Sequence, residues 1–293
     1  EEDITMKWTE IDKKQLKIYA AIAFGIPFLL GLLMWYGSSQ GRNMSVFPNA
    51  QMLYPAAGVM MAYLITRKGD KKLPKVFYIF FVALTAAMVV CTAASVLAPV
   101  NIDIMGTPFS QWMLILQYVM IGGSIVFWIL LLVSGKEKRR AYGLNSNQWS
   151  TSVLMILLFI GLYLLRLVIA SALGGQLSEF GKIMANPTTW IMFFTVLLNF
   201  FLAVVAFFGE EYGWRYYLQP LLQKRFGLKG GVILLGCVWA VWHLPIDFFY
   251  YTTPDMGLAA LASQFVTCIT LGLFMAYAYM KTQNIWVPVI IHF

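Results

Sequence analysis

The sequence is poor in charge. Of its 293 residues only 12% are Asp, Glu, Lys or Arg, against about 25% in soluble domains, and 60% are hydrophobic, against about 45–50%. Histidine occurs twice. This composition excludes an ordinary soluble domain, and the apolar and aromatic content excludes a disordered chain. It fits a membrane protein, provided that the apolar residues form runs of about 20.

Cysteine is also scarce. The three cysteines, Cys91, Cys237 and Cys268, all lie in apolar segments, and no Cys-x-x-Cys pattern occurs. An odd number of cysteines at such positions argues against a disulfide framework and against a cysteine metal site. We interpret them as small buried apolar residues.

Long apolar runs are abundant, and they predict an all-α fold, a polytopic transmembrane helix bundle. Eight runs have the length of a span: Ile18–Gly37, Ala50–Thr66, Lys75–Ala98, Gln111–Val133, Ser150–Leu173, Thr189–Gly209, Gly231–Tyr251 and Leu258–Met280. A ninth run begins at Ile285 and the sequence ends at Phe293, so we expect a truncated segment or one that only enters the membrane.

The loops between these runs are too short for a separate folded domain. We therefore expect one integral membrane domain over residues 1–293. Within it, residues 1–173 form N-terminal spans with little chemistry, and residues 189–293 carry the ionisable groups.

The basic residues alternate between loops. One set of loops holds 18 of the 21 Lys and Arg residues, the opposite set holds Arg42 and Lys182, and Arg166 lies inside a span. This is the positive-inside pattern, which predicts that the N-terminus and the loop assigned to Arg215 are cytoplasmic. The net charge of +8 is then a topology signal with some attraction to anionic lipids, and not a sign of nucleic-acid binding.

A few ionisable residues fall inside apolar runs, where each is costly and therefore a candidate for function. They are Glu210, Glu211, His243, Asp247 and His292. Both histidines of the chain are among them. The sequence thus predicts a membrane-embedded site in the last third of the chain.

The segment from Glu210 to Arg215 reads Glu-Glu-Tyr-Gly-Trp-Arg. On a continuous helix Glu211 and Arg215 are four residues apart and can pair, while Glu210 points about 100° away. The apolar stripe from Trp214 to Phe226 predicts an interfacial helix at the membrane surface.

His243 lies in the segment Trp-Ala-Val-Trp-His-Leu-Pro. Trp239 is one turn earlier and can hold the imidazole by packing. Pro245 leaves local backbone groups without helical partners. Asp247, four residues after His243, is a candidate to orient it.

Together these segments resemble the signature of the CAAX-protease and bacteriocin-processing family, which includes the type II CAAX prenyl endopeptidases. That family carries Glu-Glu-x-x-x-Arg, Phe-x-x-x-His and His-x-x-x-Asn (or a similar residue) on successive late spans. Here the first motif is complete, Trp239 replaces Phe in the second, and His292 represents the third. The sequence ends before the residue four positions after His292. The resemblance covers roughly residues 193–293.

The resemblance implies an intramembrane endopeptidase that acts at the cytoplasmic face. Glu210 with His243 would activate a water, and His292 would stabilise the oxyanion. Glu211 is implied in the catalytic group as well, with Arg215 shaping the site. The motifs contain no nucleophilic Ser or Cys, so no covalent intermediate is indicated.

Three alternatives remain at this level. Two histidines and a glutamate could bind zinc, but the sequence has no His-Glu-x-x-His and the ligands would come from three segments, so we expect no cofactor. A proton-coupled transporter would show ionisable residues in matching halves, and here they occur in one half. A non-catalytic scaffold or immunity protein of the same fold would keep the helices without the activity.

The expected partners are membrane lipids and a peptide or protein substrate, possibly lipidated. The His-Leu-Pro form and the short loops favour a bacterial cell membrane as the location.

Overall fold

The long apolar runs form helices, as predicted. In the computed structural model, which describes residues 6–293, seven helical segments are long and apolar enough to cross a membrane. They are 23 to 40 residues long: Glu10–Ser39, Lys75–Leu97, Gln111–Val133, Trp149–Leu173, Pro187–Phe226, Leu228–Tyr251 and Pro254–Thr282. The prediction of an all-α membrane bundle is confirmed.

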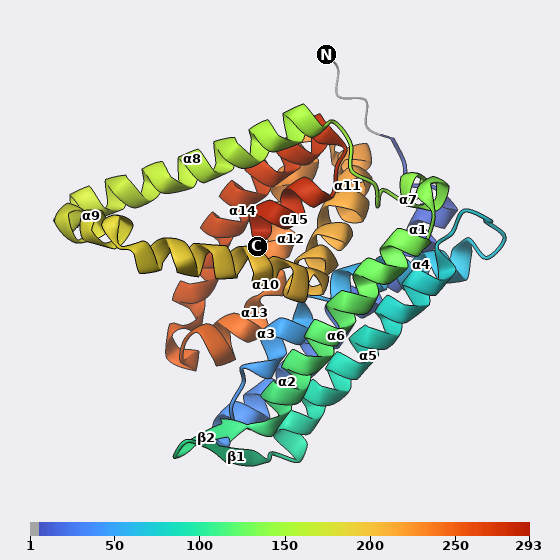
Figure 1. Cartoon of the computed structure of the whole chain (residues 1–293). Helices are drawn as coiled ribbons and strands as arrows, with labels where there is room; N and C mark the ends of the chain where they lie inside the picture. The colour runs from blue at the N-terminus through green and yellow to red at the C-terminus, as the bar shows by residue number, and fades with distance from the viewer. Residues whose placement is uncertain (1–5) are drawn as a thin grey trace.

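The bundle divides into two groups of elements and an arm (Figure 1). The first group contains α1 (Glu10–Ala20), the π-helical turn η1 (Ala21–Gly25), α2 (Ile26–Ser39), α3 (Val46–Gln51), α4 (Tyr54–Thr66), α5 (Lys75–Leu97), α6 (Gln111–Val133) and α7 (Lys136–Ala141). The arm contains α8 (Trp149–Leu173), α9 (Leu177–Ala185) and the first part of α10 (Pro187–Glu211). The second group continues with η2 (Tyr212–Leu218), α11 (Gln219–Phe226), α12 (Leu228–Trp242), α13 (Leu244–Ile246), η3 (Asp247–Tyr251), η4 (Pro254–Met256), α14 (Gly257–Thr282) and α15 (Trp286–His292).

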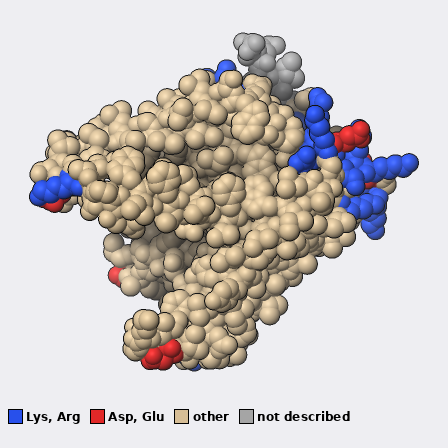
Figure 2. Space-filling view, in the orientation of Figure 1, with Lys and Arg blue, Asp and Glu red and all other residues tan. Residues whose placement is uncertain are grey.

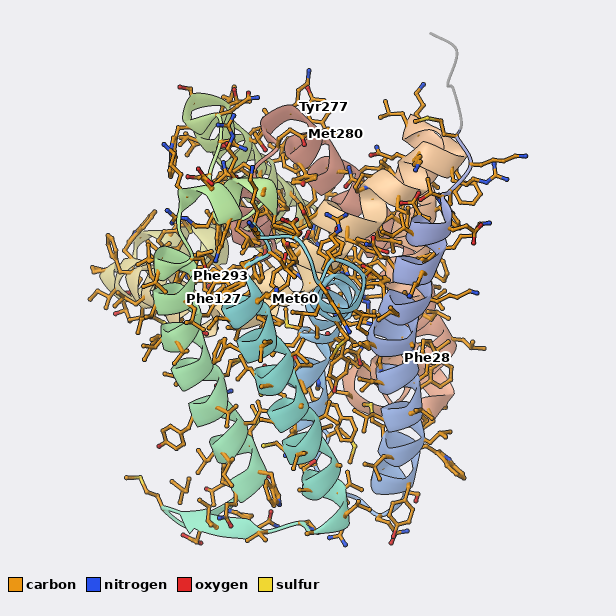
Figure 3. The ribbon with its side chains drawn as sticks, turned by 90° about the vertical axis from the view of Figure 1, so that its right-hand side faces the viewer. Phe28, Met60, Phe127, Tyr277, Met280 and Phe293 are labelled. Atoms are coloured by element: carbon orange, nitrogen blue, oxygen red, sulfur yellow. The ribbon has the colours of Figure 1, made fainter. Side chains whose placement is uncertain are left out.

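The expected span Ala50–Thr66 is not one continuous helix. It is divided between α3 and α4, and Pro55 stands in the first turn of α4, where its missing N–H is tolerated. Leu53, Ala56 and Met60 are fully buried, so this segment lies in the protein interior, where Figure 3 labels Met60, while Phe28 lies on the outer side of α2. Seven membrane-length helices are therefore found where the sequence predicts eight runs.

Two glycines allow α10 and η2 to lie directly on this interior segment. A Cβ on Gly209 would lie 2.4 Å from the Met52 carbonyl oxygen, and one on Gly213 would lie 2.2 Å from Pro55 Cβ. Only glycine fits such a close backbone approach. Since these glycines bracket Glu210 and Glu211, the contact with α4 places the carboxylate pair in the interior.

The N-terminal helices also pack on the motif-bearing helices. Trp242 Nε1 donates to the Ala23 carbonyl at 2.7 Å, and Gln51 Nε2 donates to the Trp242 carbonyl at 2.9 Å. The rings of Tyr19 and Phe24 meet the ring of Trp214 edge-on at 6.3 and 5.9 Å. The first group of helices thus forms one wall around the ionisable residues.

One short hairpin interrupts the helices. β1 (Asn101–Ile104) pairs antiparallel with β2 (Thr107–Ser110), with Asn101 opposite Ser110. Met105 and Gly106 connect them with φ angles of 52° and 81°, as a tight two-residue turn requires. The hairpin caps the end of α5 and α6 that lies away from α7 (Figure 1).

Charged side chains are concentrated at the ends of the bundle. In Figure 2 most visible Lys and Arg side chains gather where α1 and α7 lie in Figure 1, and uncharged residues cover the surface between the ends. Arg215 is not part of this basic end, because its side chain is fully buried in η2. Its assignment to a loop was wrong, and it belongs to the membrane-embedded site.

Candidate active site

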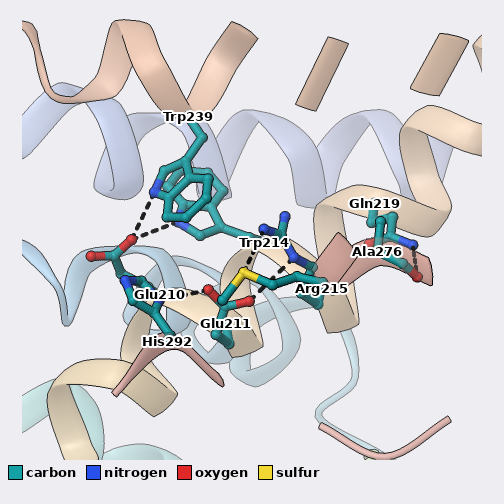
Figure 4. A network of polar contacts seen from close by, with 9 residues as sticks. Glu210, Glu211, Trp214, Arg215, Gln219, Trp239, Ala276 and His292 are labelled. Atoms are coloured by element: carbon teal, nitrogen blue, oxygen red, sulfur yellow. Dashed lines mark hydrogen bonds and ion pairs between the residues drawn. The ribbon is translucent and has the colours of Figure 1, made fainter. Parts of the chain in front are cut away.

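Glu210 and Glu211 end α10, and the helix continues into the wider turns of η2. Their side chains point in different directions, as expected for neighbours on a helix (Figure 4). Glu210 is 3% exposed and Glu211 is fully buried. Two adjacent buried carboxylates need strong partners, and the two have different ones.

Glu210 is bound by two indoles. Its Oε2 accepts hydrogen bonds from Trp239 Nε1 at 2.8 Å and from Trp214 Nε1 at 3.2 Å (Figure 4). Its Oε1 makes no hydrogen bond to any residue between 6 and 293. The carboxylate is thus fixed through one oxygen, and the other retains its full capacity to accept a proton or a hydrogen bond.

Glu211 joins a charged group of three. Its Oε2 lies 3.2 Å from Arg215 Nε, and its Oε1 lies 2.7 Å from His292 Nδ1 (Figure 4). The predicted pairing of Glu211 with Arg215 is present. The guanidinium also donates to Met275 Sδ at 3.3 Å and lies over the Trp239 ring at 5.2 Å.

Most of the predicted interfacial helix is not at the surface. Trp214, Tyr217, Leu218 and Leu221 are buried inside the bundle, and only its last residues reach the surface, where Phe226 is 46% exposed. An apolar stripe has the same sequence pattern whether lipid or protein covers it, and here α1, η1 and α4 cover it.

His243 follows the last residue of α12, and Pro245 comes two positions later in α13. Its Nδ1 lies 2.8 Å from the Trp239 carbonyl oxygen. A carbonyl can only accept, so Nδ1 carries the proton and Nε2 presents a lone pair in the neutral ring. The backbone carbonyl of Trp239 therefore orients His243.

Asp247 does not orient His243 through its carboxylate. Its backbone N–H donates to the His243 carbonyl at 2.8 Å, and its Oδ2 is buried with no hydrogen-bond partner among the described residues. Asp247 is 1% exposed. It lies on η3, and within residues 6–293 its carboxylate forms no hydrogen bond or ion pair with Glu210 or either histidine.

Trp239 brings the separate motifs together. Its indole donates to Glu210, and its ring centroid lies 6.0 Å from that of His243 and 5.4 Å from that of His292. Three segments far apart in the sequence thus meet around one side chain. Of the site residues only His292 is partly open, with a side-chain exposure of 16%, and His243 is 7% exposed.

Trp214 and Met275 were not identified from the sequence. Trp214 is four residues after Glu210, and that spacing alone could have shown that its indole reaches the carboxylate. Met275 comes from α14, which carries no motif, and nothing in its local sequence indicates a contact with Arg215.

The arrangement of the His, Cys, Asp and Glu side chains decides whether the site fits a metal ion. No group of three or more His, Cys, Asp or Glu side chains within residues 6–293 is arranged to hold a metal ion. Glu211, the nearest carboxylate to His292, is already engaged by Arg215.

Comparisons with known proteins match the part of the chain that contains this site. The family model described as "Type II CAAX prenyl endopeptidase Rce1-like" matches residues 188–293, the part that contains all three motifs. A protein from Methanococcus maripaludis named CAAX prenyl protease 2 is 25% identical over 193 residues, which cover 62% of this chain and 70% of that protein. No solved structure matches the chain significantly. The resemblance to the CAAX-protease and bacteriocin-processing family is thereby confirmed, and the family model places it in the C-terminal part of the chain.

Proposed function

We propose that this protein is an intramembrane endopeptidase of the CAAX-protease type that hydrolyses peptide bonds with a water activated by Glu210 and His243. The observation that carries the proposal is the arrangement of Glu210. Its Oε2 is bound by two indole N–H groups, and its Oε1 is left without a partner in residues 6–293. A general base must be fixed in place and still have a free lone pair, and Glu210 meets both conditions.

His243 supplies the second acceptor. With Nδ1 bound to the Trp239 carbonyl, its Nε2 lone pair is available to a water or to the amine of the leaving peptide. In the proposed reaction, the water attacks the carbonyl carbon and gives its proton to Glu210. The proton then passes to the leaving nitrogen as the C–N bond breaks.

His292 is proposed to stabilise the oxyanion. Since its Nδ1 donates to Glu211, an N–H at Nε2 requires the imidazolium form. The charges are then balanced: Glu210 and Glu211 are negative, Arg215 and His292 are positive. Glu211 and Arg215 act as positioning residues, because Glu211 binds His292 Nδ1 and Arg215 in turn pairs with Glu211.

We propose that the reaction is metal-independent. The site carboxylate best placed to coordinate a metal with His292 is occupied by Arg215, and Glu210 is bound by two N–H donors that a metal would have to displace. Activity that persists after exhaustive chelation is the expected result. Restoration of activity by zinc after chelation would establish the zinc alternative.

The substrate class is also a proposal. The relative's name, CAAX prenyl protease 2, and the match to the type II CAAX prenyl endopeptidase model support a peptide or protein substrate, with or without an attached lipid. We propose that the basic end of the bundle, and with it the N-terminus, faces the cytoplasm of a bacterial cell, with membrane lipids around the apolar surface.

The test is cleavage by purified protein in detergent or nanodiscs. A farnesylated peptide ending in a CAAX sequence and its unmodified counterpart are incubated with wild type, and products are identified by mass spectrometry. Glu210→Gln should abolish cleavage of whichever peptide the wild type cuts. Glu179→Gln, which removes an exposed carboxylate paired with Lys182, is the matched control and should leave cleavage unchanged. Cleavage by Glu210→Gln at near wild-type rate would refute the proposed base.

A further inference from the structure

A second feature lies outside the catalytic group. A cleft of about 540 Å³ opens between α6, α8, α10 and α15. Its volume is within the range of about 300–1,000 Å³ that is usual for ligand sites. None of Glu210, Glu211, His243 and His292 lines the cleft, so the cleft is separate from the candidate active site.

The rim of the cleft is positively charged. Lys136, Arg139 and Arg140 of α7 line it, and no Asp or Glu does. None of these three cations forms an ion pair with a residue between 6 and 293. The Nε of Arg139 is buried and has no hydrogen-bond partner among the same residues. The rim thus offers several unpaired donors of one charge sign, which favour an anion.

Apart from Asn145, Ser146, Ser152 and Asn284 the rest of the lining is apolar, and its aromatic part is fixed in shape. Trp128 Nε1 donates to the Phe201 carbonyl at 3.0 Å, and its ring stacks on Trp286 at 5.3 Å. Trp286 Nε1 in turn donates to the Leu144 carbonyl at 3.2 Å. A preformed aromatic floor of this kind binds an apolar chain without first having to order itself.

The cleft also faces the bilayer. Leu132 and Val153 line it and are 66% and 47% exposed, and both belong to membrane-length helices. Trp149, at the start of α8 and 68% exposed, lies at the same end as the cations, where an indole is favoured beside lipid headgroups. A molecule in this cleft reaches it from the membrane and has its charge at the membrane surface.

We propose that this cleft binds one anionic phospholipid, with its phosphate against Lys136, Arg139 and Arg140 and an acyl chain on the aromatic floor. Basic pockets between transmembrane helices are suited to such headgroups. Because α15 lines the cleft through Trp286 and Ile290 and carries His292 at its end, the lipid packs directly on the helix that bears a site histidine.

The test measures lipid binding to purified protein in detergent by native mass spectrometry. The probes are phosphatidylglycerol, phosphatidylcholine with the same acyl chains, and glycerol phosphate. The double variant Arg139→Gln/Arg140→Gln should bind phosphatidylglycerol about 30-fold more weakly, from about fivefold for each of the two cations removed. The matched control Lys14→Gln/Lys17→Gln removes two exposed charges from α1 that do not line the cleft, and binding should stay within about threefold of wild type.

A third variant separates the cleft from general charge attraction. Val153→Trp keeps every cation and fills part of the apolar floor, so it should also weaken phosphatidylglycerol binding. Its position is 47% exposed, so the added ring has room to be accommodated without unfolding the bundle, and unfolding temperatures without lipid should match wild type. Equal binding of the two phospholipids, binding of glycerol phosphate as tight as that of phosphatidylglycerol, or equal effects of the two double variants would each overturn the proposal.

Discussion

The indole of Trp239 provides the sharpest test of the proposed mechanism. The family motif has Phe at this position, whereas Trp239 donates a 2.8 Å hydrogen bond to Glu210 Oε2. Trp239→Phe removes that donor and keeps an aromatic ring beside His243 and His292. The variant therefore changes the fixation of the base while it leaves most of the packing in place.

The size of the expected loss in Trp239→Phe follows from the charge of its hydrogen-bond partner, the Glu210 carboxylate. A hydrogen bond to a charged group contributes about 1.5–3 kcal/mol. Because Trp214 Nε1, at 3.2 Å, remains as a second donor, we expect the loss of the Trp239 hydrogen bond to cost about 2 kcal/mol. If that energy serves to hold Glu210 in its reactive position, kcat/KM should fall about 30-fold, because about 1.4 kcal/mol corresponds to tenfold in rate.

The matched control is Trp242→Phe. Trp242 is as deeply buried as Trp239, but its Nε1 donates to the Ala23 carbonyl at 2.7 Å and not to a site residue. The control should lower the unfolding temperature and leave kcat/KM of the folded fraction within about threefold of wild type, since its lost bond is a structural one of about 1 kcal/mol. Both variants are assayed on the same peptide, with the folded fraction measured by size-exclusion chromatography. A Trp239→Phe variant that retains full kcat/KM would refute the reasoning about Glu210.

Three further predictions follow from the same contacts. Arg215→Met should lower the free energy of unfolding by about 3–5 kcal/mol because it leaves the buried carboxylate of Glu211 without its cation. Lys182→Met, the control, breaks an exposed pair with Glu179 and should lower it by less than about 1 kcal/mol. Equal denaturation midpoints for the two variants would contradict this. His292→Ala should lower kcat by about 10²–10³ if it is an oxyanion donor, and an effect on KM alone would exclude that role. The Tyr142 hydroxyl donates to Asp70 and lowers the pKa of that carboxyl, so the stabilisation from this hydrogen bond is present above about pH 4 and lost below it. The unfolding temperatures of Tyr142→Phe and wild type should therefore converge as the pH falls from about 5 to 3. A constant difference between them would refute the link.

The parts of the site that were predictable are those encoded by local spacing. Glu211 and Arg215 are four residues apart, and that distance along a helix brings their charges together even though the helix widens at η2. The contact between Glu211 and His292 spans 81 residues, and no local pattern specifies it. The sequence made both histidines candidate site residues, but it did not indicate that His292 would meet Glu211 or that His243 would meet the Trp239 carbonyl.

The errors have a common physical cause. The stripe from Trp214 to Phe226 and the run Ala50–Thr66 were both interpreted against a lipid surface. In the structure they pack on one another and on α1, with the Tyr19 and Tyr217 rings 4.9 Å apart. Hydropathy reports that a face avoids water, and it does not distinguish lipid from protein as the medium that replaces water.

This distinction changes the role of the N-terminal spans. They carry few ionisable residues, yet Met52 lies directly against Gly209 and Pro55 directly against Gly213. The carboxylate pair therefore depends on these helices for its position. Enlarging Gly213 to Ala would press a methyl group against Pro55, at 2.2 Å, and should displace η2 together with Arg215. Loss of activity in Gly213→Ala, with Gly122→Ala as a control at an open position, would show that the chemistry of the last third requires the packing of the first.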